Sequence, residues 1–330
     1  MGAGLVFGGR VAHWTPNGWA LRELGEWMEP IVVGKMDSSE TRHTTMLGVG
    51  AFTPDNLNTK EVVEGDRPYA SILGLTTRRI VVKATPTSPG SFDKEVYRTA
   101  LTTELTLGVL GLGLAKEVQT AIHRAMRNVN ELTPYDPLGW HNQISDGGEP
   151  TVGFRLGVEH RVTDGLFDKP LGLGDERHFE GTVFSDATIG YYTNVSAGAA
   201  IRAGIFQSEF WNFTPGALGS VNQGIGPVSE REENRRFEFF IYGSIRGRAV
   251  AYNALLQGQW RDNPYELNGS DLNRWIGEYQ FGPVLSIGRR LNISYIFAGR
   301  TSEIKGPFSR SHRWAGPQIT LISRLDPRGY

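Results

Sequence analysis

Three polar residues close together in the chain, Glu117, Gln119 and His123, have side chains suited to acid–base chemistry. A histidine titrates near neutral pH and can take a proton from water. Gln119 and His123 stand four residues apart, so on a helix their side chains lie on neighbouring positions of one face. Glu117 would lie about 120° from His123 around the same helix. The spacing is compatible with a hydrolytic site, although a lone histidine on a surface helix is more often simply solvated.

A helix is expected from Leu114 to Arg127 because apolar residues recur there at helical spacing. Val118, Ile122 and Ala125 fall at i, i+4 and i+7 and would form its apolar stripe. The flanking segments instead alternate apolar and polar residues with period two. The helix is therefore an insertion among strands, and we expect it to project His123 into the interior of a barrel.

Period-two alternation, which is typical of a β-strand with two different faces, recurs along most of the chain. In residues 237–251 one face carries Phe239, Ile241 and Ile245, and the other carries Arg246 and Arg248. The expected strands are 5–13, 17–24, 44–53, 69–83, 96–109, 151–162, 179–191, 195–205, 237–251, 275–288, 291–297 and 314–325.

The lengths and faces of these strands favour an all-β fold, an antiparallel transmembrane β-barrel of about twelve strands in which 1–330 form a single domain. Many of these strands are longer than the roughly five or six residues that are usual for strands in soluble proteins. Charged residues such as Arg155 and Glu159 repeat on one face, as a polar lumen requires, and Trp275 and Trp314 lie near strand ends, as in interfacial girdles. A large soluble sandwich or barrel that binds glycans or lipids remains the alternative, because alternation alone does not separate the two.

The composition excludes several classes of protein. The 330 residues carry a net charge of −1, so no overall electrostatic field favours nucleic acid. The chain has no cysteine, which excludes disulfides and cysteine-based zinc sites. Its 42 glycines and 11% aromatic residues suit a barrel with crowded strand faces. It has no apolar run long enough for a membrane-spanning helix, and its first residues lack the basic segment of a signal peptide.

Several ordered motifs surround the candidate helix. They read GVLG at 108–111, E-x-Q-x-x-x-H at 117–123 and GWHNQ at 139–143, preceded by TPNG at 15–18, FTP at 52–54 and DRPYA at 66–70. In this order the motifs resemble those of the LpxR-like lipid A 3′-O-deacylase family of Gram-negative outer membranes. The resemblance covers residues from about 12 to 163, and beyond them the chain fits only as generic barrel strands.

The resemblance implies a twelve-stranded outer-membrane barrel that hydrolyses the ester of the 3′-linked acyloxyacyl group of lipid A. His123 would be the general base that activates a water molecule, and Ca²⁺ would polarise the ester carbonyl. Glu117 and Gln119 would belong to the polar site around that histidine, and Thr15 would correspond to the family's active-site threonine.

Two further residues correspond to family positions, Glu131 as an acidic metal-binding residue just past the helix and Lys60 as a basic substrate-binding residue. The implied partners are lipid A or lipopolysaccharide and the outer membrane itself, without nucleic acid. We expect a monomer, because a closed barrel needs no partner.

One departure from the family pattern concerns the start of the chain. The family begins with a strand that ends in Asn-Asp, and those residues help to form the Ca²⁺ and oxyanion site. Before Thr15 this chain has no Asn, Asp or Glu. Two explanations stay open: the first strand is truncated by a late start, or this copy has lost its metal ligands and is a non-catalytic or degenerate outer-membrane barrel.

Overall fold

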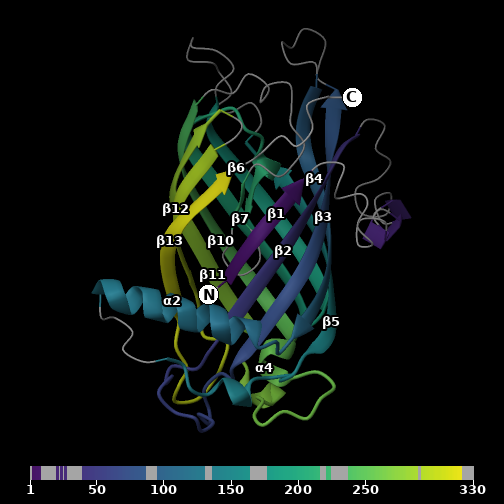
Figure 1. Ribbon diagram of the computed structural model, residues 1–330. Helices are drawn as coiled ribbons and strands as arrows, with labels where there is room; N and C mark the ends of the chain where they lie inside the picture. The colour runs from purple at the N-terminus through teal and green to yellow at the C-terminus, as the bar shows by residue number, and fades with distance from the viewer. Residues whose placement is uncertain are drawn as a thin grey trace.

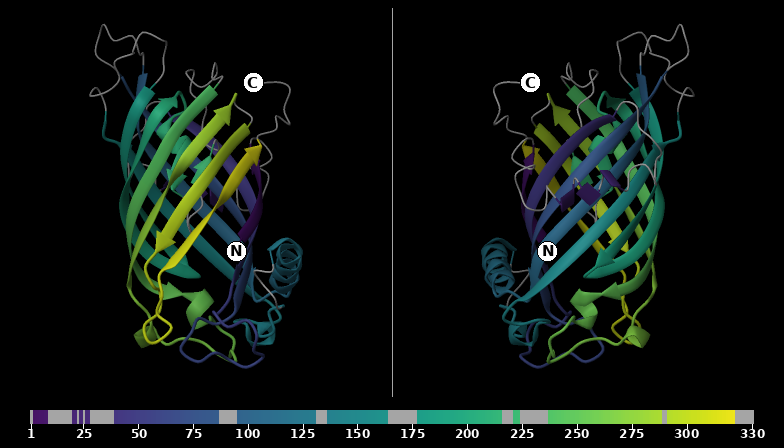
Figure 2. Two further views of the ribbon diagram at one scale, coloured as in Figure 1. Left: turned by 90° about the vertical axis from the view of Figure 1, so that its left-hand side faces the viewer. Right: turned by 90° about the vertical axis from the view of Figure 1, so that its right-hand side faces the viewer.

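Within the residues that the structure describes, eleven antiparallel strands form one sheet that curls into a barrel (Figures 1 and 2). The computed structural model describes residues 2–8, 20–21, 23–24, 26–27, 39–86, 95–130, 136–163, 177–215, 221–223, 237–288 and 291–321. The strands of the barrel are β1 (Gly2–Gly8), β2 (Ser39–Phe52), β3 (Ala70–Pro86), β4 (Glu95–Leu110), β5 (Glu149–Arg161), β6 (Arg177–Gly190), β7 (Tyr192–Phe206), β10 (Phe237–Asn253), β11 (Trp275–Ile287), β12 (Leu291–Arg300) and β13 (His312–Leu321). A separate two-stranded sheet pairs β8 (Phe213–Pro215) with β9 (Val221–Gln223).

Each strand of the barrel is hydrogen-bonded to the strand next to it in chain order, with β7 paired to β10. The order runs from β1 to β13, and these two edge strands lie on the same side of the barrel in Figures 1 and 2. The antiparallel all-β barrel expected from the alternation is therefore confirmed. The strand expected at 17–24 is wrong for the residues that the structure describes there, because 20–21 and 23–24 are helical.

The barrel wall has apolar side chains on its outer face and polar side chains on its inner face, the reverse of the arrangement in a soluble protein. On β10, Phe239, Ile241 and Ile245 are 49%, 60% and 67% exposed, whereas Arg246 and Arg248 on the opposite face are buried. The same inversion holds on β5, where Val152 is exposed and Arg155 is buried. Apolar side chains cover the outer wall and polar ones face the lumen, so the wall suits a hydrocarbon surrounding rather than water.

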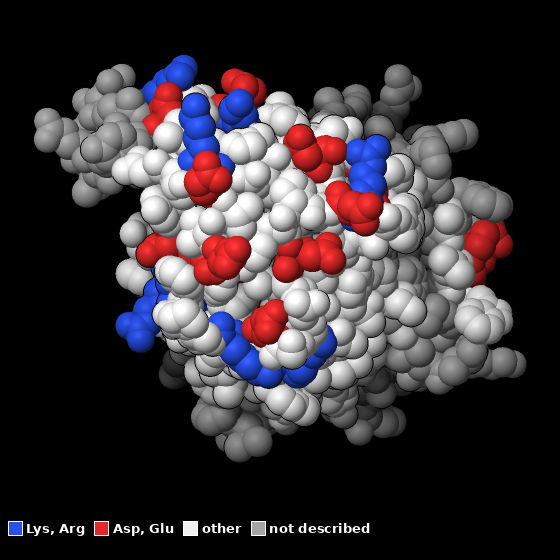
Figure 3. Space-filling view, turned by 90° about the horizontal axis from the view of Figure 1, so that it is seen from below, with Lys and Arg blue, Asp and Glu red and all other residues white. Residues whose placement is uncertain are grey.

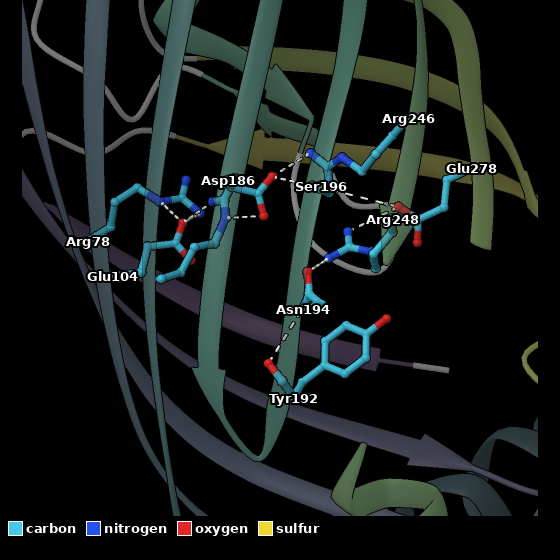
Figure 4. A network of polar contacts seen from close by, with 10 residues as sticks. Arg78, Glu104, Asp186, Tyr192, Asn194, Ser196, Arg246, Arg248 and Glu278 are labelled. Carbon is cyan, nitrogen blue, oxygen red and sulfur yellow. Dashed lines mark hydrogen bonds and ion pairs between the residues drawn. The ribbon is translucent and has the colours of Figure 1, made fainter. Parts of the chain in front are cut away.

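The lumen holds a chain of oppositely charged side chains that come from six of the strands (Figure 4). Successive members alternate in sign, and their closest N–O separations range from 2.5 Å between Arg78 and Glu104 to 3.8 Å between Arg246 and Glu278. Buried charges are tolerated when each has a partner, and the antiparallel register sets Arg78, Glu104 and Arg155 directly opposite one another. The members in order around the wall are Arg78, Glu104, Arg155, Asp186, Arg246, Glu278 and Arg248.

The helices lie mainly at one end of the barrel, the lower end in Figure 1. They are α2 (Leu114–Asn130), η2 (Trp140–Asn142), α4 (Ala254–Gln257) and η5 (Gly269–Asp271), while η3 (Phe210–Asn212) follows β7. The helix expected from Leu114 to Arg127 is thus confirmed and runs three residues further, to Asn130. Within the part of the chain that the structure describes, no helix has both the length and the hydropathy needed to cross a membrane.

Candidate active site

Among the side chains of α2 that the structure describes, three are buried and form a stripe: Ala115, Gln119 and His123, each four positions after the last. Their side chains are 1%, 7% and 3% exposed. Because residues at i, i+4 and i+8 share one helix face, this stripe turns a histidine and an amide towards the protein. Of the expected apolar stripe, Val118 is half-buried, and the side chains of Ile122 and Ala125 lie outside the part of the helix that the structure describes.

The helix α2 lies across the outside of the barrel wall, close to the start of β1 (Figures 1 and 2). Ala115 packs with Tyr69 and Trp140, and Ala51 at the end of β2 lies against the same cluster. The expectation that the helix projects His123 into the lumen is therefore wrong. The histidine is buried on a helix that lies against the outside of the barrel wall.

A glycine turn sets the direction in which the chain leaves β4 and enters α2. Gly111 has φ +71°, and a Cβ atom there would overlap the backbone carbonyl of Ser145 at 1.8 Å. Its amide donates a 3.0 Å hydrogen bond to the carbonyl of Ser71. Only glycine combines this conformation with so close a backbone neighbour, so the GVLG motif has a structural role in aiming the helix.

Trp140 connects the segment after α2 to the buried stripe. Its indole nitrogen donates a 2.9 Å hydrogen bond to Oε1 of Gln119. The indole ring lies 5.0 Å from the ring of Tyr69, at an interplanar angle of 57°. Burial raises the pKa of Tyr69 above its usual value, so this phenol stays protonated at neutral pH. Trp140 therefore contacts a candidate site residue directly.

Gln143 anchors the same segment to β3. Its Oε1 accepts a hydrogen bond of 3.1 Å from the hydroxyl of Ser71, and its Nε2 donates one of 2.6 Å to Asp146. The next amide, that of Ile144, donates to the carbonyl of Tyr69. These contacts hold Trp140 at a defined position relative to the wall.

Lys60 lies in a loop that is bound to the segment of Trp140. Asn142 donates a 2.7 Å hydrogen bond to the backbone carbonyl of Lys60, and the amide of Leu138 donates to the carbonyl of Leu57. The Lys60 side chain is exposed. The structure thus brings the backbone of Lys60 near the segment that contacts Gln119, with its ammonium group in solvent.

Glu117 lies on a different side of α2 and is exposed, so the helix does not bring its carboxylate onto the buried stripe with His123. The neighbouring Arg124 forms a 2.9 Å ion pair with Asp136, which joins the helix to the segment after it. The hydrogen bond to Asp136 and its negative charge raise the pKa of Arg124.

Thr15 and Glu131 lie outside the residues that the structure describes. Within the described ranges, no group of three or more His, Cys, Asp or Glu side chains could hold a metal ion.

Asp66 and Arg67 hold the loop before β3 in place. Asp66 accepts hydrogen bonds from the amides of Asp55 and Arg67, at 2.8 Å and 2.7 Å, and pairs with Arg310 at 3.4 Å. Tyr265 donates to the carbonyl of Asp66 from 199 residues away. Several loops are therefore tied together at this end, and Figure 3 shows acidic side chains spread over it, with lysines and arginines mainly towards its margin.

The spacing of Gln119 and His123 predicted their shared helix face, but the addition of Ala115 to that face and the chain of ion pairs in the lumen were not predicted. The recurrence of Ala115, Gln119 and His123 at every fourth position was visible in the sequence and marks one face of a helix. The alternation also showed that Arg155 and Arg246 share a face, but it did not identify Glu104, Asp186 and Glu278 as their partners.

Comparisons with known proteins identify a family that the chain matches and a solved structure with a similar fold. The family model described as "Outer membrane protein LpxR" matches residues 3–321. A solved structure of LpxR from Salmonella typhimurium superimposes with a TM-score of 0.66 and 15% sequence identity, covering 98% of this chain and 88% of that chain. A search of curated protein sequences finds no match. At this identity the structural likeness shows a shared fold.

Proposed function

Because the chain belongs to the LpxR family of outer-membrane proteins, we propose that it is a lipid A deacylase that hydrolyses the ester of the 3′-linked acyloxyacyl group, with His123 as the general base. The protein is located in the outer membrane, as the family name states, and its apolar outer wall is consistent with that location. Lipid A or lipopolysaccharide would be the substrate, and the protein would act as a monomer.

One observation supports the catalytic part of the proposal. His123 is 3% exposed on a helix that covers the outer wall, one turn from the amide of Gln119. An exposed histidine on such a helix would have been the ordinary solvated residue. A buried imidazole beside an amide, at a surface that lipid reaches without entering the lumen, is suited to hydrolysing an ester of a membrane lipid.

The chemistry assigned to the chain's own residues is a general-base hydrolysis. Nε2 or Nδ1 of His123 takes a proton from a water molecule, and the water oxygen attacks the ester carbonyl carbon. The tetrahedral intermediate then breaks the bond to the sugar oxygen. That oxygen recovers the proton from the imidazolium, leaving a free 3′-hydroxyl group and a released acyloxyacyl acid.

Calcium belongs to this proposal through the family resemblance. When bound, Ca²⁺ would stabilise negative charge on the carbonyl oxygen. Glu131, Thr15 and Lys60 carry over from the same resemblance as metal-binding, active-site and substrate-binding residues respectively.

The test uses the full chain refolded into detergent micelles with purified lipid A, followed by mass spectrometry. The expected result is loss of mass equal to the 3′ acyloxyacyl group, and His123→Ala should abolish it. His141→Ala is the matched control, because His141 is an exposed histidine at the same end of the barrel.

Heat-modifiable gel migration should show that both variants fold. Full activity in a folded His123→Ala protein would contradict the assigned base. An unchanged lipid A mass with the folded wild-type protein and added calcium would instead favour the non-catalytic barrel.

A further inference from the structure

The contact between Trp140 and Gln119 determines which end of the amide is held by the protein. An indole nitrogen can only donate a hydrogen bond. The atom of Gln119 that faces it at 2.9 Å is therefore the carbonyl oxygen, whatever the ambiguity between O and N that affects most amide side chains. The orientation of this amide follows from chemistry.

A primary amide is planar, so its NH₂ group points away from the direction of its carbonyl oxygen. From this geometry we infer that Gln119 presents its amide N–H groups to the substrate beside His123, and that Trp140 is the positioning residue that holds them there. The inference rests on the proposed function. It makes Gln119 a hydrogen-bond donor to an ester oxygen and not a metal ligand through its carbonyl.

Trp140 is itself rigidly held, as a positioning residue must be. It is 2% exposed and packs against Tyr69 and Ala115. Gly139, immediately before it, allows this approach because a Cβ atom there would lie 2.6 Å from the Tyr69 ring. The direction of the indole N–H therefore depends on three neighbouring groups, and a side chain at position 139 would shift the ring of Tyr69 or the tryptophan.

A donor one helical turn from a general base meets a chemical need of ester hydrolysis. Negative charge develops on the carbonyl oxygen as the water attacks, and a preoriented N–H stabilises that charge. Gln119 and His123 belong to one buried stripe, about 6 Å apart along the helix axis. One residue would accept the proton of the water while the other donates to the oxygen that becomes charged.

The kinetic test compares four proteins on purified lipid A in detergent micelles: wild type, Gln119→Glu, Trp140→Phe and the double variant. Gln119→Glu keeps an acceptor oxygen for the indole but removes the amide donors, so kcat should fall about 100-fold with little change in KM. Trp140→Phe removes the indole N–H and keeps an aromatic ring, and kcat should fall about tenfold. Trp260→Phe, at an exposed tryptophan, is the matched control.

The double variant separates positioning from mere packing. If Trp140 acts through Gln119, Trp140→Phe should cause no further loss of kcat in the Gln119→Glu background. An equal loss in both backgrounds would show a packing role and overturn the inference. A wild-type kcat in Gln119→Glu would also overturn it, while leaving the deacylase proposal intact.

A second measurement does not depend on activity. In protein labelled with ¹⁵N-tryptophan, the indole N–H of Trp140, assigned from the signal missing in Trp140→Phe, should exchange slowly with D₂O. Its exchange should stay slow in Gln119→Glu and become at least about tenfold faster in Gln119→Ala, because only the latter lacks an acceptor. Unchanged exchange in Gln119→Ala would overturn the inference. If the wild-type protein binds lipid A without cleaving it, the proposed function is wrong. The exchange measurement would still determine the orientation of the Gln119 amide, because it does not require activity.

Discussion

Arg155 on β5 donates a 2.9 Å hydrogen bond to Glu104 on the adjacent strand β4, and the same carboxylate oxygen pairs with Arg78 on β3. Glu104 thus neutralises two guanidinium groups inside the lumen. Each of the three side chains is largely removed from solvent, so none can be compensated by water if its partner is lost.

Glu104→Gln should therefore destabilise the barrel, because it leaves two buried arginines facing a neutral amide. We expect the free energy of unfolding to fall by about 3 kcal/mol, measured by urea unfolding in lipid vesicles. Glu61→Gln, at an exposed loop position, should stay within about 0.5 kcal/mol of wild type. Equal unfolding of the two variants would contradict the role of the charge chain.

Ile245→Arg tests the lipid-facing wall. Ile245 is 67% exposed and lies at the middle of β10. An arginine near the bilayer midplane costs about 2–4 kcal/mol, whereas the same change on a surface in water would be nearly neutral. The variant should unfold at lower urea concentration in vesicles, and Trp260→Arg in the exposed loop should not. A neutral Ile245→Arg would remove the argument for lipid contact on this strand.

Two glycines two residues apart provide a matched pair for the turn before α2. Gly111→Ala should lower both the yield of folded barrel and the deacylase activity, because its φ of +71° and the nearby Ser145 carbonyl exclude a Cβ atom. Gly113→Ala should be tolerated, since a Cβ atom there would meet nothing within 4 Å. Heat-modifiable migration and lipid A mass spectrometry give the two readouts. Similar behaviour of both variants would mean that the turn does not aim the helix.

Removal of calcium should abolish lipid A hydrolysis, and added Ca²⁺ should restore it while Mg²⁺ should not, because Mg²⁺ demands a stricter octahedral site. Glu131→Ala should raise the Ca²⁺ concentration needed for half-maximal activity, and Glu266→Ala, at an exposed loop position, should not. Activity that persists in excess chelator would contradict the calcium requirement and leave the general-base proposal standing.

Glu117 and His123 should differ strongly when mutated. Glu117→Gln should lower kcat by less than about tenfold, because the exposed carboxylate lies off the buried stripe. Loss of the general base in His123→Ala should lower kcat by about 10²- to 10⁴-fold. Steady-state kinetics on lipid A compares the two. A loss in Glu117→Gln as large as that in His123→Ala would show that the helix turns this residue into the site during catalysis.

The sequence by itself determined most of the strands, although not the one expected at 17–24, together with the inserted helix and the polarity of the two faces of the wall. Alternation with period two is a local property, so the sequence of each strand indicates which of its side chains share a face without information about the neighbouring strands. The strand expected at 275–288, for example, corresponds to β11 at Trp275–Ile287. The motifs around His123 were likewise legible, because their residues are close together in the chain.

Only the tertiary structure decided which groups meet. On the buried stripe of α2, Ala115 packs with Tyr69 and Trp140, and Gln119 accepts a hydrogen bond from Trp140. No periodicity within the helix states what will pack against it. The pairing of Arg155 with Glu104 depends on the register between two strands 51 residues apart. Contacts of this kind arise from the pairing of strands and from the loops at the end of the barrel, so local patterns cannot specify them.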